Sequence, residues 1–448
     1  MIETKALKTA LRRFSRRDFL RSTMVSASVF SAIPAAHVWG VPGLEQSAQL
    51  LVTLQLDGGV DVTMLCDPKV NVEGEPKINH WADAADPEQI GAIRYAPVAE
   101  NRALFELYGA DTLVINGVDA QTNSHETGKL FNWTGVNSEG QPSLSALFAA
   151  AQAPELPLAY SVFGGLSRTG GVIGYNRFDD LSVLRGLTQP NVEPWSGELK
   201  RWTSEIDRAQ ASVDERSARL MTNNLRSVRQ QESLLRFSQS RQRREDLTRL
   251  ADLIPSEENI AKREEFTAGG MVLSSNLKQQ IQSALLVFQS GLGVSADLSL
   301  GGFDSHEENE PIQEVLLSHL YDSLNFFWDT AESLGLADRI LLVIGSDFGR
   351  TNFINEGNGK DHWPIGSYMI MEQGASWGNR VVGRTDELHF SKTIDPLTLG
   401  PSDRGVTMTP THIHKAVRGY LGIEEFAIDL GFDLSATPSL PLFDPFIS

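Results

Sequence analysis

Short apolar runs that stop at glycine or aspartate constrain most strongly how this chain folds. Such runs occupy residues 50–56, 112–116, 294–300 and 339–344, and a fifth apolar run occupies 367–371. Their length and apolar composition are typical of strands buried on both faces. Residues 312–327 instead carry apolar side chains at three- and four-residue steps, which is the spacing of an amphipathic helix. Strands that alternate with helices predict an α/β domain with a mostly parallel sheet covered on both faces.

The N-terminal segment predicts export. Residues 12–21 are rich in arginine and precede a moderately apolar run of small residues at 22–36, which is too short to span a bilayer. The string at 15–21 resembles a twin-arginine signal, which the twin-arginine export machinery reads. We therefore expect a signal peptide at 1–40, a body at 41–448 without a stable membrane span, and a periplasmic or secreted protein. The alternative is a basic amphipathic helix packed on the body.

A helical insertion is expected at about 198–255. The stretch between Gly197 and Pro255 contains no internal glycine or proline and carries many arginines mixed with acids. This composition predicts one or two long helices whose mixed charges face solvent. The alternative is a basic helical stripe that binds an anionic surface.

Charge and cysteine content exclude two classes of function. The formal net charge is −18 at pH 7, and the acidic residues are spread along the chain. Such a surface repels a polyanion, so nucleic-acid binding is excluded. The single cysteine, Cys66, excludes both a disulfide framework and a cysteine-based zinc site.

Acidic, hydroxyl and imidazole groups gather next to the predicted strand ends. The candidates are Asp57, Asp61, Ser124, His125, Asp304, His306, Asp347, Arg350 and, in a glycine-rich loop before the fifth run, His362. In open α/β sheets the ligand crevice lies at the carboxyl ends of the strands, so we expect these groups to converge. Carboxylates and imidazoles suit a divalent metal such as zinc, manganese, magnesium or calcium. The alternative for each aspartate taken alone is a helix cap or a turn.

Five segments resemble the motifs of one bacterial family of exported proteins. These segments are LVTLQLDGGVD, NSHETG, GGFDSHEENE, GLADRILLVIGSDFGRT and GNGKDHW. The family is domain of unknown function 1501, placed in the alkaline phosphatase/sulfatase superfamily, and the resemblance covers roughly residues 48–425. It implies an alkaline-phosphatase-like α/β/α sandwich with a mostly parallel central sheet, here with a helical insertion.

The resemblance also implies roles for the candidate residues. Asp57, or Asp61 in its place, resembles a metal ligand at the end of the first strand. Asp304 and His306 resemble the ligands of one metal, and Asp347 resembles a ligand of the other. His362 resembles the histidine late in the chain that completes a metal site. Ser124 resembles the nucleophile, at a helix start where backbone N–H groups face an anion. Arg350 is expected to fork onto phosphoryl or sulfuryl oxygens.

Two departures from the superfamily pattern bear on the metal count. Phe348 follows Asp347 where the superfamily commonly has histidine, so a ligand of the second metal is missing. Asp304 and His306 are also separated by a single residue, whereas the corresponding pair of metal ligands in the superfamily usually has a wider spacing in the sequence. A one-metal site, or a site that binds without turnover, is the alternative to a metal pair, and His125 is a candidate ligand or acid/base group in place of the lost histidine.

The leading functional hypothesis is an exported metal-dependent hydrolase of phosphate or sulfate esters with a serine nucleophile. Its substrate is expected to be a small anionic ester or a sulfated or phosphorylated glycan. The alternative is a non-catalytic envelope protein that retains the fold and holds at most a structural metal.

Overall fold

A computed structural model describes residues 48–164, 166–177, 181–188, 204–221, 230, 234 and 244–447. The predicted signal peptide at 1–40 lies outside the described residues. None of the helices in the described part combines the length and the apolar composition that crossing a membrane requires.

An eight-stranded sheet forms the centre of the molecule, in the order β14-β4-β13-β10-β1-β9-β5-β6. Its strands are β1 (Leu50–Asp57), β4 (Thr112–Asp119), β5 (Tyr160–Val162), β6 (Asn176–Arg177), β9 (Ser295–Gly301), β10 (Ile340–Ser346), β13 (Ile365–Met371) and β14 (Arg380–Val382). β13 runs antiparallel to both neighbours, and the other adjacent pairs are parallel. The predicted mostly parallel sheet is confirmed.

The central strands form because their side chains are apolar on both faces. Every residue of β10 is buried, and β1 is buried except for its last residue, Asp57. An alternating pattern would leave one face polar, whereas these continuous runs require helices on both sides.

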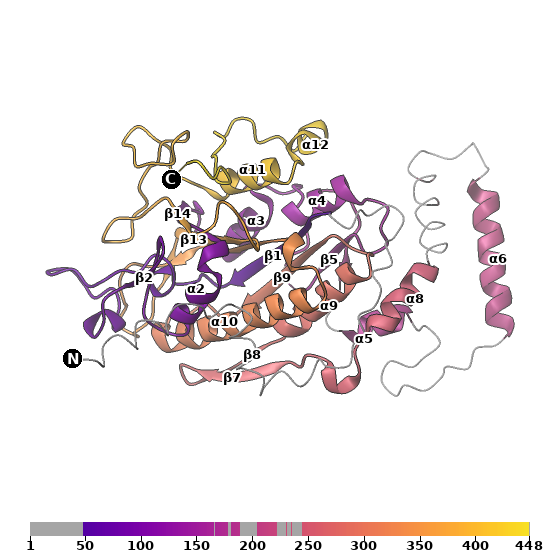
Figure 1. Ribbon diagram of the computed structural model, residues 1–448, viewed down its shortest axis with the longest axis horizontal. Coiled ribbons are helices and arrows are strands. Elements are labelled where there is room, and N and C mark those ends of the chain that lie inside the picture. The colour runs from indigo at the N-terminus through magenta and orange to yellow at the C-terminus, as the bar shows by residue number, and fades with distance from the viewer. Residues whose placement is uncertain are drawn as a thin grey trace, which may run out of the picture.

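The described residues contain ten helices. They are α2 (Asn101–Tyr108), α3 (His125–Thr134), α4 (Leu144–Gln152), α5 (Leu181–Thr188), α6 (Ser204–Met221), α8 (Arg244–Leu253), α9 (Leu277–Gln289), α10 (Asn309–Ser333), α11 (Pro410–Tyr420) and α12 (Glu424–Asp429). α3 and α4 pack on β1, while α9 packs on β9 and against α10. These two groups lie on opposite sides of the sheet, which gives the predicted α/β/α sandwich (Figure 1).

Helices α6 and α8 lie within the range where the sequence predicts a helical insertion. Much of the remaining range lies outside the described residues.

Three two-stranded hairpins stand outside the sheet. They pair β2 (Glu88–Ile90) with β3 (Ile93–Tyr95), β7 (Glu264–Ala268) with β8 (Met271–Ser275), and β11 (Gly349–Arg350) with β12 (His362–Trp363). The β11–β12 hairpin lies between β10 and β13 in the chain and places Arg350 opposite His362. It therefore extends the carboxyl edge of the sheet beyond the ends of the parallel strands.

One acid, Asp297 of β9, lies fully buried in the middle of the sheet. Its carboxylate accepts hydrogen bonds from the hydroxyls of Thr53, at 2.6 Å, and of Tyr160. Burial raises the pKa of Asp297 to about 6, against an ordinary value of 3.8, and the hydroxyl hydrogen bonds offset only part of this rise. The folded state therefore holds the proton more tightly than the unfolded state does.

We expect this proton to make stability depend on pH. The contribution of protonated Asp297 is fully present below the unfolded pKa and is lost as pH rises through about 6. Relative to Asp297→Asn, the wild type should lose about 2 kcal/mol of unfolding free energy between pH 4 and pH 7. Urea unfolding of both proteins across this range measures the difference. A difference that stays constant with pH would contradict the assignment.

Candidate metal centre

The candidate site lies at the carboxyl edge of the sheet. Asp57 is the last residue of β1, Asp347 follows β10 directly, and Asp304 lies three residues after β9. Because β13 is antiparallel, its first residue, Ile365, pairs with the last residue of β4. The residues that precede β13, among them His362, therefore reach the same edge.

Three imidazoles and one carboxylate converge at this edge. The Nε2 atoms of His306 and His362 lie 3.0 and 3.2 Å from Asp304 Oδ1, and His125 Nε2 lies 3.5 Å from Asp304 Oδ2. The Nε2 atoms of His306 and His362 are 3.0 Å apart. Within the described part of the chain, His125, Asp304 and His362 form the group that satisfies the spacing of metal ligands. We call the four residues the His–Asp cluster.

Each imidazole of the cluster is oriented through its other nitrogen. His125 Nδ1 lies 2.5 Å from Asp347 Oδ2. His306 Nδ1 lies 2.8 Å from Asp361 Oδ1, and His362 Nδ1 lies 2.8 Å from the carbonyl oxygen of Asn123. An acceptor at Nδ1 places the ring proton there and leaves the Nε2 lone pair facing the cluster. This arrangement is typical of metal-ligating histidines.

The cluster fits a divalent cation. His125 Nε2 is buried and has no hydrogen-bond partner among the described residues. Two Nε2 lone pairs 3.0 Å apart repel each other unless a proton or a cation lies against them. Imidazole nitrogens with one carboxylate are also a donor set that transition metals such as zinc accept.

Asp347 orients His125 from a fully buried position instead of facing the cluster. Its carboxylate accepts hydrogen bonds from the backbone N–H groups of Gly58, at 3.1 Å, and Gly59, at 2.7 Å. Both glycines have positive φ, and a Cβ at Gly58 would lie 2.5 Å from the backbone nitrogen of Asp304. The hydrogen bond to Asp347 outweighs burial and raises the pKa of His125. Asp347 thus orients His125 of the His–Asp cluster and does not face the cluster itself.

Arg350 does not have the free guanidinium that its predicted role requires. The side chain is fully buried and donates to the backbone carbonyls of Gly58, Gly59 and Lys360 and, at 2.6 Å, to Asp304 Oδ1. With these partners it cannot fork onto a substrate. It fixes Asp304 instead: burial raises the pKa of that carboxyl, but the hydrogen bond and charge of Arg350 bring it down to about 2.

Asp61 also takes a different role from the predicted one. It is fully buried, and both of its carboxylate oxygens are occupied. Oδ1 accepts from the backbone N–H and the hydroxyl of Thr63, while Oδ2 accepts from Asn309 and forms an ion pair with Lys360, each at 2.8 Å. We therefore assign Asp61 to the structural network and withdraw it as a metal ligand.

Asp57 lies beside the cluster and is paired with a lysine. Lys129 Nζ is 3.3 Å from Asp57 Oδ1 and belongs to α3, one turn after His125. Burial raises the pKa of Asp57 to about 6, the charge of Lys129 lowers it and that of Asp347 raises it. The structure thus gives the Asp57 carboxylate a cationic partner other than a metal.

Ser124 is exposed at the N-cap of α3, directly before His125. Its side chain makes no capping hydrogen bond, so the hydroxyl does not accept a hydrogen bond from the first turn of α3. The serine therefore lies next to a member of the cluster, at the positive end of a helix dipole.

Two supporting residues were not assigned roles from the sequence. Asp361, the residue directly before His362, lies 2.8 Å from the Nδ1 atom of His306 through its Oδ1 atom. Phe348, which stands where the superfamily commonly has a metal-binding histidine, packs its ring against His125 and His362, with centroids 4.7 Å apart in both pairs. The sequence signal for Asp361 was its position in the loop, whereas the contact of Phe348 depends on the folded arrangement.

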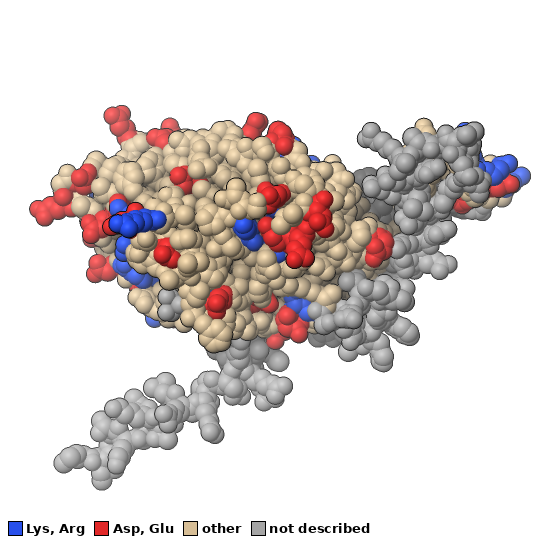
Figure 2. Space-filling model, turned by 90° about the horizontal axis from the view of Figure 1, so that it is seen from above, with Lys and Arg blue, Asp and Glu red and all other residues tan. Residues whose placement is uncertain are grey.

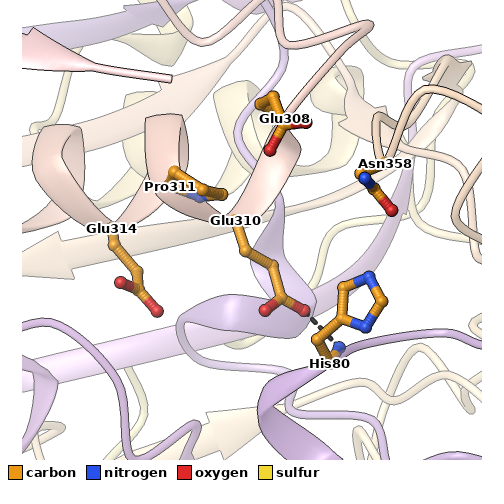
Figure 3. Close-up of a pocket in the computed structure, with 6 residues that line it drawn as sticks. All are labelled: His80, Glu308, Glu310, Pro311, Glu314 and Asn358. Carbon is orange, nitrogen blue, oxygen red and sulfur yellow. Dashed lines mark hydrogen bonds between the residues drawn. The ribbon is translucent and has the colours of Figure 1, made fainter. Parts of the chain in front are cut away.

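A separate hollow lies near the start of α10 and does not include the cluster (Figure 3). It is lined by His80, Glu308, Glu310, Pro311, Glu314 and Asn358. Glu310 accepts a hydrogen bond from the backbone N–H of His80, and its charge adds to the burial that raises the pKa of Glu314. Three carboxylates in this hollow repel an anionic ligand.

One family model matches part of the chain. Residues 186–400 match the family model described as "Protein of unknown function (DUF1501)", a range that contains Asp304, His306, Asp347 and His362. This match confirms the resemblance inferred from the motifs. No curated protein sequence matches the chain.

Solved structures of low sequence identity resemble the chain. Ps i-CgsB in complex with k-i-k-neocarrahexaose is 6% identical, with 89% of this chain and 76% of that one covered and a TM-score of 0.41. A Vibrio parahaemolyticus protein in the alkaline phosphatase superfamily is 8% identical, with coverage of 85% and 68% and a TM-score of 0.37. The phosphonate monoester hydrolase of Agrobacterium radiobacter is 12% identical, with coverage of 84% and 74% and a TM-score of 0.32. At these values the similarity identifies neither a ligand nor a reaction.

We expect a metal chelator to lower the melting temperature of the protein. A cation that binds only the folded state stabilises it by about 2.7 kcal/mol at a hundredfold excess over Kd. His306→Ala should remove most of the chelator effect, whereas His80→Ala, outside the cluster, should retain it. Thermal melts with and without chelator, beside elemental analysis, measure this. Identical wild-type melts with no bound metal would contradict a metal at the cluster.

Proposed function

We propose that this chain, whose residues 186–400 belong to the DUF1501 family, is an exported metal-dependent hydrolase of phosphate or sulfate esters. The observation that carries the proposal is the His–Asp cluster, in which three oriented imidazoles face one carboxylate. The side chains of Asp304 and His306 are each 46% exposed, so solvent and a small ester reach the cluster. Catalytic metal sites keep such an open side, whereas structural sites are closed.

His125, Asp304, His306 and His362 would hold the metal. Zinc suits this donor set best, although manganese also accepts imidazole and carboxylate ligands. The metal would act as a Lewis acid on the ester and would lower the pKa of a bound hydroxyl. Asp347, Asp361 and the Asn123 carbonyl keep the three rings in the tautomer that ligation requires.

Lys129 is the cation that we propose for attracting the anionic ester, in place of Arg350. It lies one turn after His125 on α3, and side chains on a helix lean toward the N-terminus, here toward the site. Its ammonium is partly exposed, whereas every contact of Arg350 is internal. The chain carries a formal net charge of −18 at pH 7, and the face in Figure 2 shows clusters of Asp and Glu among mostly uncharged residues. A local cation therefore matters for holding an anion.

Ser124 is the proposed nucleophile. Its free N-cap hydroxyl adjoins His125, and the first-turn N–H groups of α3 are available to an anionic group. The substrate class that follows is a small anionic ester or a sulfated or phosphorylated glycan.

One observation favours a second function. The cluster has four donor side chains, three of them at the spacing of a metal-binding group, and four protein ligands are the number that closes structural zinc sites. This count supports a non-catalytic envelope protein with a structural metal, and turnover by the metal-loaded protein distinguishes the two functions.

We expect Ser124→Ala to lower kcat for aryl phosphates or sulfates by roughly a thousandfold or more, because the covalent route is lost. Its metal content should equal that of the wild type, since the serine is not a ligand. Steady-state kinetics with elemental analysis measures both. An active Ser124→Ala variant would remove the serine nucleophile but leave a hydrolase, whereas an inactive metal-loaded wild type would favour the envelope protein.

We also propose periplasmic or secreted localisation through the twin-arginine pathway, supported by the string at 15–21. Replacing Arg16 and Arg17 together with lysine should leave the precursor in the cytoplasm, because the pathway reads that pair. The neighbouring pair, Arg12 and Arg13, replaced in the same way, is the matched control and should not stop export. Cell fractionation measures the outcome, and a normal periplasmic yield from the first variant would exclude this route.

A further inference from the structure

A buried lysine stands directly before two residues of the candidate metal centre. Lys360 is fully buried, and its Nζ donates to Asp61 Oδ2 at 2.8 Å, Asn79 Oδ1 at 3.0 Å and Thr63 Oγ1 at 3.1 Å. Three acceptors satisfy all three donors of the ammonium, which offsets part of the cost of burying its charge. The next residue in the chain is Asp361.

The backbone of Lys360 is fixed as firmly as its side chain. Its N–H donates to the carbonyl of Ser305 at 3.1 Å, and its carbonyl accepts from Arg350 Nη1 at 2.9 Å. With both ends of the residue held, the positions of Asp361 and His362 follow from the position of Lys360.

Asp61, the ion-pair partner of Lys360, is also hydrogen-bonded to the segment that follows His306. Asp61 Oδ2 also accepts from Asn309 Nδ2, and Asn309 Oδ1 accepts from the hydroxyl of Ser305. Gly359 approaches the same segment so closely that a Cβ there would lie 1.7 Å from the carbonyl oxygen of His306. The ion pair therefore joins the loop after β1, the segment after β9 and the loop before β12.

We infer that the Lys360–Asp61 pair is a positioning device that sets the metal affinity of the His–Asp cluster. It holds the loops of His306 and His362 at the spacing that brings their Nε2 atoms together, and it holds Asp361 against the Nδ1 atom of His306. Neither Lys360 nor Asp61 touches the metal. This inference rests on the proposed metal centre but not on ester hydrolysis.

The test is the zinc affinity of the full chain, measured by competition with a chromophoric chelator. We expect Lys360→Met to weaken zinc binding by about 10- to 100-fold, the usual cost of losing an outer-shell partner. The matched control is Lys278→Met, which removes a largely buried lysine that pairs with Glu264 and Asp322 away from the cluster. This control should bind zinc as the wild type does.

Lys360→Met leaves Asp61 as an unpaired buried charge and risks unfolding. The double variant Asp61→Asn with Lys360→Met removes both charges, and we expect it to show the same loss of affinity. Wild-type affinity in whichever of the two variants is folded overturns the inference. Zinc binding without ester hydrolysis by the wild type overturns the proposed hydrolase alone, whereas a wild type that binds no zinc overturns both.

Discussion

The buried guanidinium of Arg350 is the interaction on which the rest of the candidate site depends. It donates to the backbone carbonyls of Gly58, Gly59 and Lys360 and to the carboxylate of Asp304. These partners belong to the turn after β1, the loop after β9 and the loop before β12, which are far apart in the sequence. A planar group with five donors in fixed directions can join three loops in this way, whereas a lysine at this position would offer a single ammonium.

Buried charge at this edge of the sheet is therefore organised in pairs. Arg350 lies against Asp304, Lys360 against Asp61, and His125 against Asp347. Each pair costs free energy to desolvate, and an apolar replacement of similar shape would often be at least as stable. What such pairs supply is a fixed arrangement of side chains. The three pairs lie at the edge of the sheet that carries the His–Asp cluster.

The sequence was sufficient to predict the layers of the fold and the edge at which the site lies. Short continuous apolar runs are typical of buried strands. Polar residues that follow such parallel strands lie at the carboxyl edge of the sheet. The sequence was not sufficient to predict the direction of β13, because an apolar run carries no information about strand polarity. His362 precedes its strand, and it reaches the cluster only because that strand is reversed.

The roles of single charged residues were harder to predict than their place in the chain. Asp57 is the last residue of β1 and Asp61 follows four residues later, yet only the folded contacts show that Asp61 is buried in an ion pair with Lys360. Arg350 likewise looks like an anion-binding residue until its carbonyl partners are seen. Burial of a long side chain depends on loops remote in sequence, so a local pattern does not determine it.

The reversed direction of β13 has a consequence for how the site is encoded. Because the chain returns along the same edge, the segment from Asp304 to His362 supplies three of the four cluster residues, and α3 supplies only His125. Most of the cluster thus comes from one continuous stretch, residues 304–362. Insertions elsewhere in the chain do not change the number of residues between Asp304 and His362. Outside this stretch, the site depends on the turn after β1, whose Gly58 and Gly59 carbonyls hold Arg350, and on the start of α3, which carries His125.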